Sequence, residues 1–294
     1  MMKNDSCSMQ NKVDVSVVIP MYNAGRYIES TISSILQQKK HGLRLEILVI
    51  DDASTDDSCQ VVRQINAPGI TLIELDKNGG TANARNHGLK IASGVWVQFL
   101  DSDDRLGEDL YAKFELSTQP GFNCYVFSLI LEKDQSTIKQ TVTEIIDKRA
   151  FGYFGSVCNK FIKRDVCVSF KKEYKVEDVC FIVDMLNSAD LKIALIPQAY
   201  YIYNCKNEDS KNANFDVREY HKMYSYLYRQ INGSDDFTKK YILEISIGLL
   251  FYKPMPVWRR VQIATKTSLR LLRYLPSVAK KGIRNCIENI PISS

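Results

Sequence analysis

The sequence predicts an α/β fold: a Rossmann-like, mainly parallel central sheet with helices on both faces, followed by a helical C-terminal region. Apolar segments of strand length alternate with segments of helical periodicity four times in the first part of the chain. The strand segments are apolar almost throughout, as in sheets that are buried on both faces. Polar residues follow each strand, at the edge where ligands of such sheets bind.

Four strands are expected, at Val15–Pro20, Leu45–Ile50, Ile70–Leu75 and Val95–Leu100. Three helices are expected between them: one over Tyr27–Leu36, one that carries Val61, Val62 and Ile65, and one that begins at Ala82 and ends at Gly94. Pro20 is expected to end the first strand because it lacks an amide donor. Ser54 or Thr55 is expected to cap the second helix.

Each of the four strands is followed by polar or charged side chains. These clusters are Pro20, Tyr22 and Asn23; Asp51 and Asp52; Lys77 and Asn78; and Asp101 to Asp104. Because the carboxyl ends of parallel strands meet at one edge of the sheet, the four clusters are expected on one rim.

The last cluster holds three aspartates within Asp101–Asp104. Like charges this close raise one another's pKa, which favours a bound Mg²⁺ or Mn²⁺ ion and, with it, a nucleotide phosphate. The alternative is an Asp-rich turn that caps a helix whose first turn holds Glu108 and Asp109. Convergence of the clusters on one rim favours the metal. A calcium loop of the EF-hand type is excluded, because Leu106 and Ala112 stand where it needs Gly and Glu.

The bulk composition is that of an ordinary soluble globular protein, with 294 residues, 45% of them hydrophobic and 25% charged. Eight cysteines are scattered without a C-x-x-C pair, so we expect reduced, mostly buried thiols in a reducing compartment. The polar segment 1–12 is expected to be a frayed, flexible terminus rather than a signal peptide. No apolar run is long enough to span a bilayer.

The second half of the chain is less regular. Expected elements are strands at Tyr125–Leu131, Ile138–Val142, Leu191–Ile196 and Ala199–Tyr203, a helix turn at Glu144–Ala150, and a helix carrying Val179, Ile182, Val183 and Leu186. The aromatic loop 151–155 either packs in the core or forms a wall of a substrate pocket. On spacing alone, Glu177 and Asp178 are explained as partners of the dipole of the helix that they open.

The C-terminal region is strongly basic. Nine Lys and Arg residues and no Asp or Glu lie between Ile245 and Ile287, although the whole chain carries only +5. A helix over Val257–Leu275 would place its cations on one stripe and apolar residues opposite. Such a helix either packs on its own domain or lies on an anionic membrane surface, and the cations that continue from 253 to 284 favour the membrane. No nucleic-acid recognition fold accompanies this charge, so nucleic acid is not expected as a partner.

Five motifs within Asp14–Ala189 resemble the family 2 glycosyltransferases of the GT-A fold, in the order that this family has them. They are VSVVIPMYNAGRYIESTISSIL, LEILVIDDASTD, KNGGTANARNHGLKIASGVWVQFLDSDD, NKFIKRD and KVEDVCFIVDML. Dehydrogenase, P-loop and serine-hydrolase signatures are absent. The resemblance implies transfer of a sugar from a nucleotide donor, typically a UDP-sugar, with inversion at the anomeric carbon.

The resemblance also implies a role for individual residues on the nucleotide side. Pro20, Tyr22 and Asn23 match positions that frame the base, and Asp52 matches the acid that hydrogen-bonds uracil. Asn78 and Arg85 match further contacts to uridine. Asp101 and Ser102 match positions near the ribose.

On the reacting side, Asp103 matches the metal ligand, for Mn²⁺ or Mg²⁺, and Asp178 matches the catalytic base. This match outweighs the helix-dipole explanation for Asp178. Glu177 and Lys160 are expected on the acceptor side. His221 has no spacing that supports a place on the metal, so it is expected to be solvated or packed.

The expected organisation is a flexible segment 1–12, a catalytic domain 13–205 and a helical basic region 206–294. Within the catalytic domain, 13–104 forms the nucleotide-sugar half and 105–205 the acceptor half. The expected activity is a metal-dependent hexosyl or N-acetylhexosaminyl transfer to a glycan or lipid-linked acceptor, in bacterial surface polysaccharide synthesis of the O-antigen or capsule type. The expected place is the cytoplasm, including the inner face of the cell membrane.

Two other classes of function fit the sequence less well. The first is a nucleotide-sugar-binding regulator without turnover, against which the intact Asp103 and Asp178 speak. The second is a nucleotidyltransferase, which would carry a Gly-rich basic loop after the first strand, whereas Met21–Arg26 offers only Gly25 and Arg26.

Overall fold

The computed structural model describes residues 13–133, 136–140, 156–174, 176–188, 190–205 and 217–230, with a few positions between 233 and 242. The chain divides into two compact units, Met1–Asn214 and Phe215–Ser294. The first unit contains the sheet and all the residues of the predicted site. In the second unit the described helix is α7, Val217–Gln230. The predicted division into functional domains stays a prediction.

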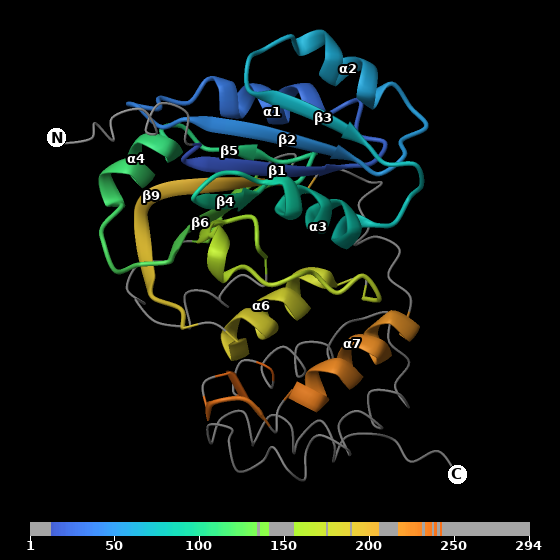
Figure 1. Ribbon diagram of the computed structural model, residues 1–294, viewed down its shortest axis with the longest axis vertical. Helices are drawn as coiled ribbons and strands as arrows, with labels where there is room; N and C mark the ends of the chain where they lie inside the picture. Colours follow the sequence, from blue (N-terminus) through green and yellow to red (C-terminus); the bar gives the residue numbers. More distant parts are fainter. Residues whose placement is uncertain are drawn as a thin grey trace, which may run out of the picture. The chain divides into compact units, whose positions relative to one another are not determined.

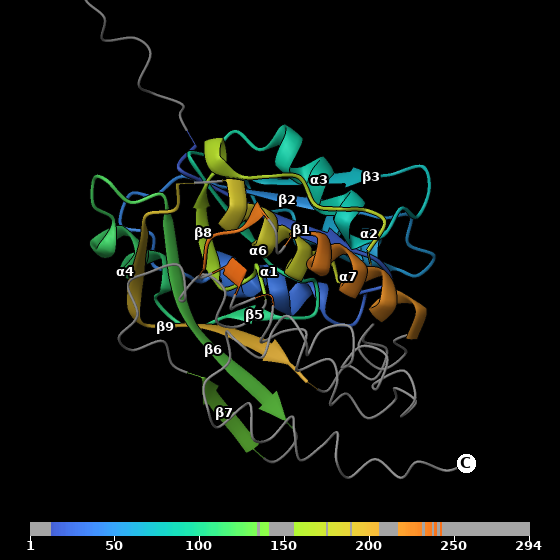
Figure 2. The ribbon, with the colours of Figure 1, turned by 90° about the horizontal axis from the view of Figure 1, so that it is seen from below.

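A mixed sheet of nine strands forms the centre of the first unit, in the order β3-β2-β1-β4-β8-β6-β9-β5, with β7 paired to β6 (Figure 1). The strands are β1 Val15–Met21, β2 Leu45–Asp51, β3 Ile70–Glu74, β4 Trp96–Phe99, β5 Arg105–Leu106, β6 Cys124–Lys133, β7 Ser136–Gln140, β8 Lys160–Lys163 and β9 Ile193–Asn204. Strands β3, β2, β1 and β4 are parallel. Strand β8 then runs antiparallel to both β4 and β6, and β6 forms a hairpin with β7 (Figure 2).

The helices cover both faces of the sheet, and in both views α1 and α3 lie on opposite sides of β1 and β2 (Figures 1 and 2). They are α1 Ile28–Leu36, α2 Ser58–Ile65, α3 Thr81–Ile91, α4 Leu110–Ser117 and α6 Glu177–Ser188, with a 3₁₀ turn at Arg164–Val166. All seven residues of β1 are buried, as a strand covered on both faces must be. The predicted α/β fold is confirmed.

Several local predictions at strand and helix ends are wrong. Strand β1 continues past Pro20 to Met21, whose carbonyl accepts a hydrogen bond from the amide of Asp52 (2.8 Å). Neither Ser54 nor Thr55 caps α2, which begins only at Ser58. The N-cap position of α2 is Asp57, and the hydroxyl of Ser54 donates to Asp51 instead.

The helix-capping alternative for the aspartate cluster is also wrong. Strand β5 lies between the cluster and α4, which begins at Leu110 and has no acidic residue in its first turn. Asp109 stands before that turn with a left-handed backbone (φ 57°) and makes no side-chain cap. The aspartates of 101–104 therefore need another explanation.

Two further boundaries differ from the predictions. Helix α3 ends at Ile91 rather than at Gly94, whose amide instead donates to the hydroxyl of Ser16 (2.8 Å). The two strands predicted on either side of Pro197 form one continuous strand, β9, which contains a local irregularity next to this proline. Gln198 has a φ of 54°, and the pairing with β6 shifts register at this point.

Several predicted features lie outside the described residues. They are segment 1–12, the helix turn 144–150, the aromatic loop 151–155, the helix 257–275 and the basic run 253–284. None of the helices in the described part of the chain is both long enough and apolar enough to cross a bilayer. The cysteines described are all free thiols, and Cys124, Cys158 and Cys180 among them are buried.

The contact between α3 and the sheet depends on a glycine. A Cβ at Gly88 would lie 2.3 Å from Cγ1 of Val18 on β1 and 3.3 Å from Cγ1 of Ile50 on β2. Because Val18 is wholly buried and cannot move aside freely, the helix can approach this closely only at a residue without a side chain.

We predict that Gly88→Ala destabilises the protein by about 1–3 kcal/mol, the usual cost of overpacking a filled core. The measurement is the free energy of unfolding in urea. His87→Ala, one residue earlier and exposed, is the matched control and should change this free energy by less than about 0.5 kcal/mol. Equal effects for the two variants would contradict the close approach at Gly88.

Candidate active site

The first two loops of the predicted rim are tied to each other by hydrogen bonds. Asn23, after β1, accepts a bond from the amide of Thr55 (2.8 Å) through Oδ1, and its own amide donates to the hydroxyl of Ser54 (2.9 Å). Asn23 has a left-handed backbone (φ 49°), which asparagine adopts more readily than most residues. The preceding Tyr22 is left 47% exposed, whereas Pro20 is buried in β1. The ring of Tyr22 is therefore partly exposed to solvent at the rim.

Asp52, at the end of β2, ties this strand to the loop before α3. Its Oδ1 accepts a bond from the amide of Gly79 (2.9 Å), and its Oδ2 accepts one from the amide of Gly80 (2.7 Å). Gly80 has a φ of 83°, a conformation that favours glycine. The exposed Asn78 accepts a third bond from the same amide (3.2 Å). Asp52 thus shapes the loop, a contact that the sequence did not predict, and its contact with uracil stays a prediction.

The aspartate loop after β4 is held by hydrogen bonds from helix α1 and strand β9. The hydroxyl of Thr31 on α1 lies 2.8 Å from the carbonyl oxygen of Asp104 and 3.0 Å from that of Ser102. Oδ1 of Asp104 accepts a bond from the amide of Asn204 (2.7 Å), and its Oδ2 accepts one from the hydroxyl of Tyr201. Asp101, Ser102 and Asp103 remain partly exposed, whereas Asp104 is buried.

The charges of this loop fit a divalent cation. Burial, together with the negative charges of Asp101 and Asp103, raises the pKa of Asp104 well above its usual range. A cation beside Asp103 would relieve that repulsion, and carboxylate oxygens are ligands that Mg²⁺ and Mn²⁺ accept. The described residues contain no cluster of three or more His, Cys, Asp or Glu arranged to hold a metal. An ion held by this loop would take one or two of its carboxylates, together with phosphate oxygens, as ligands.

Arg85 on α3 joins the aspartate loop to the start of α6. It is 2% exposed, and its Nη2 donates to Oδ1 of Asp101 (2.7 Å). Its Nη1 donates to Oε1 of Glu177 (3.2 Å) and to Oδ1 of Asp178. The ring of Phe170 lies 5.3 Å from Cζ of Arg85 and covers the guanidinium. The geometry thus brings together, around one cation, carboxylates that are far apart in the sequence.

Asp178 has the environment of a carboxylate with a raised proton affinity. Burial is the main cause that raises its pKa; Arg85 opposes this, and Asp101 adds to it. Its Oδ2 accepts a bond from the amide of Val157 (3.3 Å), so both of its oxygens are held. A fixed carboxylate with a raised pKa can act as a general base near neutral pH.

Lys160 on β8 is wholly buried, although it was expected on the acceptor side. Its Nζ donates to the carbonyl of Ser156 and to Oδ1 of Asn159 (2.8 Å). Burial lowers its pKa to about 8, while the charge of Asp178 acts in the opposite direction. An acceptor could touch this side chain only after its neighbours had moved, and its role stays a prediction.

Three residues that contact the predicted site residues were not predicted from the sequence. Phe170 covers Arg85, the buried thiol of Cys158 lies 3.9 Å from Nη2 of Arg85, and Tyr201 bonds Asp104. None of them belongs to a recognisable motif, and each lies more than 70 residues from its partner. Only the aromatic composition of β9 hinted at Tyr201.

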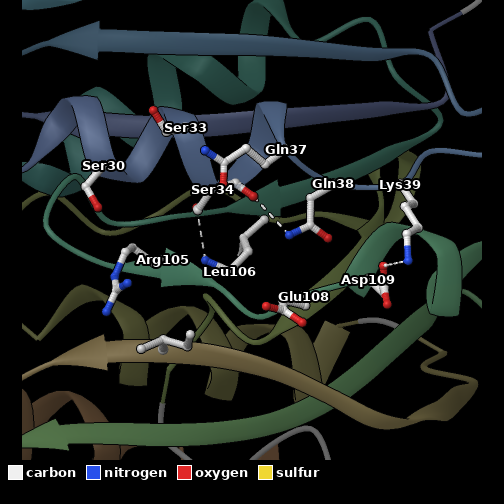
Figure 3. Close-up of a pocket in the computed structure, with 11 residues that line it drawn as sticks. Ser30, Ser33, Ser34, Gln37, Gln38, Lys39, Arg105, Leu106, Glu108 and Asp109 are labelled. Carbon is white, nitrogen blue, oxygen red and sulfur yellow. Dashed lines mark hydrogen bonds and ion pairs between the residues drawn. The ribbon is translucent and has the colours of Figure 1, made fainter.

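A cavity of about 500 Å³ lies elsewhere, between α1 and the segment that begins at Arg105 (Figure 3). Its lining includes Ser34, which accepts a bond from the amide of Leu106 (3.1 Å), and the ion pair of Lys39 with Asp109 (3.2 Å). None of the residues predicted for the site lines it. The predicted chemistry and this cavity are separate features of the first unit.

The fold and the site residues define a class of α/β protein with an aspartate loop facing a carboxylate pair, and comparison with known proteins identifies the family. The model of glycosyl transferase family 2 matches residues 16–174, more than half of the chain. The chain belongs to this family, and the resemblance found in the sequence is confirmed.

One relative is named for the biosynthesis of a teichoic acid. The minor teichoic acid biosynthesis protein GgaB of Bacillus subtilis is 27% identical over 212 residues, which are 67% of this chain and 23% of GgaB. The chain thus spans about a quarter of the length of this relative.

Solved structures share the fold. Residues 1–349 of Staphylococcus aureus TarS, in complex with UDP, align with a TM-score of 0.69 and 20% identity over 94% of this chain and 87% of that one. The mannosyltransferase PcManGT from Pyrobaculum calidifontis, in complex with GDP-Man and Mn²⁺, aligns with a TM-score of 0.57 and 14% identity over 95% and 86%. The expected GT-A fold is confirmed by this likeness.

The burial of Lys160 predicts a pH dependence of stability. Its pKa is about 8 in the folded protein and near 10.5 in the unfolded chain, so between these values the unfolded chain binds more protons. The free energy of unfolding should therefore rise with pH over this window, by roughly 3 kcal/mol from this group.

Urea denaturation at pH 7.5 and 10.5 tests this prediction against Lys160→Met, which keeps the length of the side chain and removes the charge. The difference in the free energy of unfolding between the two proteins should shift in favour of the wild type as the pH rises. A difference that does not depend on pH would contradict a depressed pKa.

Proposed function

We propose that this chain transfers a sugar from a UDP-sugar to a hydroxyl of a glycan or lipid-linked acceptor, with inversion, in the synthesis of a cell-surface polysaccharide. The observation that carries the proposal is the position of Asp178, which shares the guanidinium of Arg85 with Asp101 of the aspartate loop. A base and a nucleotide-binding loop thus face each other across one side chain. The name of GgaB supports the polymer, and the UDP bound to TarS supports the nucleotide.

The nucleotide would lie along the rim. The exposed ring of Tyr22 would stack on the base, with Pro20 and Asn23 shaping its loop. Asp52 and Asn78 would meet the uracil edge, and Asp101 and Ser102 would lie near the ribose. These residues surround the ends of four adjacent strands, which is where ligands bind in sheets of this type.

The reacting centre would use carboxylates in two roles. Asp103 would hold Mn²⁺ or Mg²⁺, which when bound supplies the positive charge that neutralises the leaving diphosphate. Asp178 would take the proton of the acceptor hydroxyl as its oxygen attacks the anomeric carbon from the face opposite the diphosphate. One displacement of this kind inverts the centre, so no covalent intermediate on a Ser or Cys is needed.

The remaining parts of the proposal concern the acceptor and the place of action. The carboxylate of Glu177 already pairs with Arg85. If Glu177 also contacted an acceptor hydroxyl, its carboxylate would bond both groups at once. Binding of segment 253–284 to an anionic membrane surface would bring the enzyme to a lipid-linked acceptor. Both stay predictions.

We predict that Asp178→Asn lowers kcat for UDP release from UDP-GlcNAc, UDP-glucose and UDP-galactose by about 10²–10⁴, because the amide cannot accept the proton. Water serves as the acceptor in this assay. The affinity for UDP, measured by calorimetry, should change by less than about threefold, since Asp178 does not touch the nucleotide in the proposed complex.

Asp184→Asn on the same helix is the matched control; Asp184 pairs with Lys171 (3.6 Å) and should be dispensable for turnover. Ordinary turnover by Asp178→Asn would remove this residue from the role of base. Absence of UDP release by the wild-type protein, with intact UDP binding, would favour a nucleotide-sugar-binding protein instead.

A separate prediction concerns the metal ligand. Asp103→Ala should weaken UDP binding in the presence of Mn²⁺ by about tenfold or more, and leave binding in EDTA nearly unchanged, because only the metal-bridged contact is lost. Calorimetry with and without Mn²⁺ measures both quantities. Asp109→Ala, at the separate cavity, is the control, and an equal effect of both substitutions would contradict the assignment of Asp103.

A further inference from the structure

The four residues of the aspartate loop form a tight turn. The amide of Asp104 donates to the carbonyl of Asp101 (3.1 Å), so Ser102 and Asp103 are the two central residues of this turn. Asp104 is 1% exposed, and both of its carboxylate oxygens accept hydrogen bonds from β9. Asp104 is therefore the anchor of the turn, whereas Asp103 stays partly exposed.

The hydroxyl of Tyr201 on β9 reaches both ends of this turn. It donates to Oδ2 of Asp104, and it accepts a bond from the amide of Asp101 (3.4 Å). The pairing of the sheet explains this reach, because β5 begins directly after the turn and runs antiparallel to β9, with Leu106 opposite Tyr201. Tyr201 is 1% exposed, so close packing fixes its ring. One buried hydroxyl thus joins the first and last residues of the turn.

A second buried hydroxyl holds the turn from α1. Oγ1 of Thr31, which is also 1% exposed, lies 2.8 Å from the carbonyl oxygen of Asp104 and 3.0 Å from that of Ser102. The carbonyl of Ser102 belongs to the peptide bond that joins it to Asp103. The backbone on either side of the expected metal ligand is therefore held in place by groups outside the turn.

We propose that Tyr201 and Thr31 are positioning residues for the metal ion, because they pre-organise the turn so that the carboxylate of Asp103 meets Mn²⁺ or Mg²⁺ together with the diphosphate. A turn that is ordered before the ion arrives avoids the loss of affinity that ordering it on binding would cause. The inference rests on the proposed function in one respect, namely that Asp103 is a metal ligand. Tyr201 and Thr31 themselves touch neither the ion nor the nucleotide.

The test is the affinity of the full chain for UDP, measured by calorimetry in Mn²⁺ and in EDTA. Tyr201→Phe removes the hydroxyl and keeps the ring. We expect its affinity for UDP in Mn²⁺ to fall by about fivefold or more, because groups that orient a metal ligand strongly affect metal affinity. Its affinity in EDTA should stay within about twofold of the wild type. An unchanged affinity in Mn²⁺ would overturn the proposal, and so would an equal loss in both conditions.

Tyr111→Phe is the matched control. Tyr111 on α4 is also wholly buried, and its hydroxyl donates to Oε1 of Gln98 (2.8 Å), outside the turn. The control variant thus loses a buried hydrogen bond of a similar kind, but it should bind UDP in Mn²⁺ as the wild type does. Equal losses for Tyr111→Phe and Tyr201→Phe would overturn the positioning role, because any buried hydroxyl would then have the same effect.

Thr31→Val tests the other side of the turn, and it also preserves the test if Tyr201→Phe does not fold. Valine has nearly the shape of threonine but cannot donate to the carbonyls of Ser102 and Asp104. We expect the same pattern, a loss of UDP affinity of about fivefold or more in Mn²⁺ with little change in EDTA. Wild-type affinity of Thr31→Val in Mn²⁺ would overturn the proposal.

A double variant separates this inference from the proposed function. If Tyr201 acts through Asp103, then Tyr201→Phe combined with Asp103→Ala should bind UDP in Mn²⁺ as weakly as Asp103→Ala alone. Independent, multiplicative losses would overturn the positioning role while leaving Asp103 as the metal ligand. A wild-type protein that binds UDP equally well in Mn²⁺ and in EDTA would instead refute the metal site, and with it that part of the proposed function.

Discussion

One buried guanidinium that faces three carboxylates is the constraint on which the rest of the rim depends. Arg85 is almost fully buried, so its charge is tolerated only because it forms ion pairs with Asp101, Glu177 and Asp178. Removal of one partner from a buried ion pair typically costs about 3–5 kcal/mol. Helix α3, the loop after β4 and the start of α6 are therefore held in one arrangement. The close approach of α3 to the sheet at Gly88 sets where that guanidinium lies.

The cluster around Arg85 carries more negative charge than positive charge. Three carboxylates share one cation, Asp103 adds a further negative charge in the same loop as Asp101, and Asp104 of that loop is buried. A divalent ion that binds together with a nucleotide diphosphate would balance these charges, which links the electrostatics of the rim to the proposed chemistry. The raised pKa of Asp178 belongs to the same balance, because burial and Asp101 outweigh Arg85. Binding and proton transfer would thus use one set of charges.

Local patterns in the sequence predicted the four parallel strands, the helices between them and the polar residues at their ends, because each depends on neighbours within a few positions. Long-range partners were not predictable in this way. Asp178 lies 93 residues from Arg85, and Tyr201 lies 97 from Asp104, and no spacing rule joins such pairs. Ser54 was wrongly expected to cap a helix because its hydroxyl has a competing acceptor, Asp51, that propensity alone does not reveal. The burial of Lys160 was missed for a similar reason, since it depends on how β8 is covered.

A crystal structure of the full chain with UDP and Mn²⁺ tests the central claim most directly. The account predicts the uracil beside Tyr22 and Asp52, the diphosphate and the ion at Asp103, and the Asp178 carboxylate across the site with its bond to Arg85 intact. UDP bound in the cavity between α1 and the segment after Arg105 would contradict it.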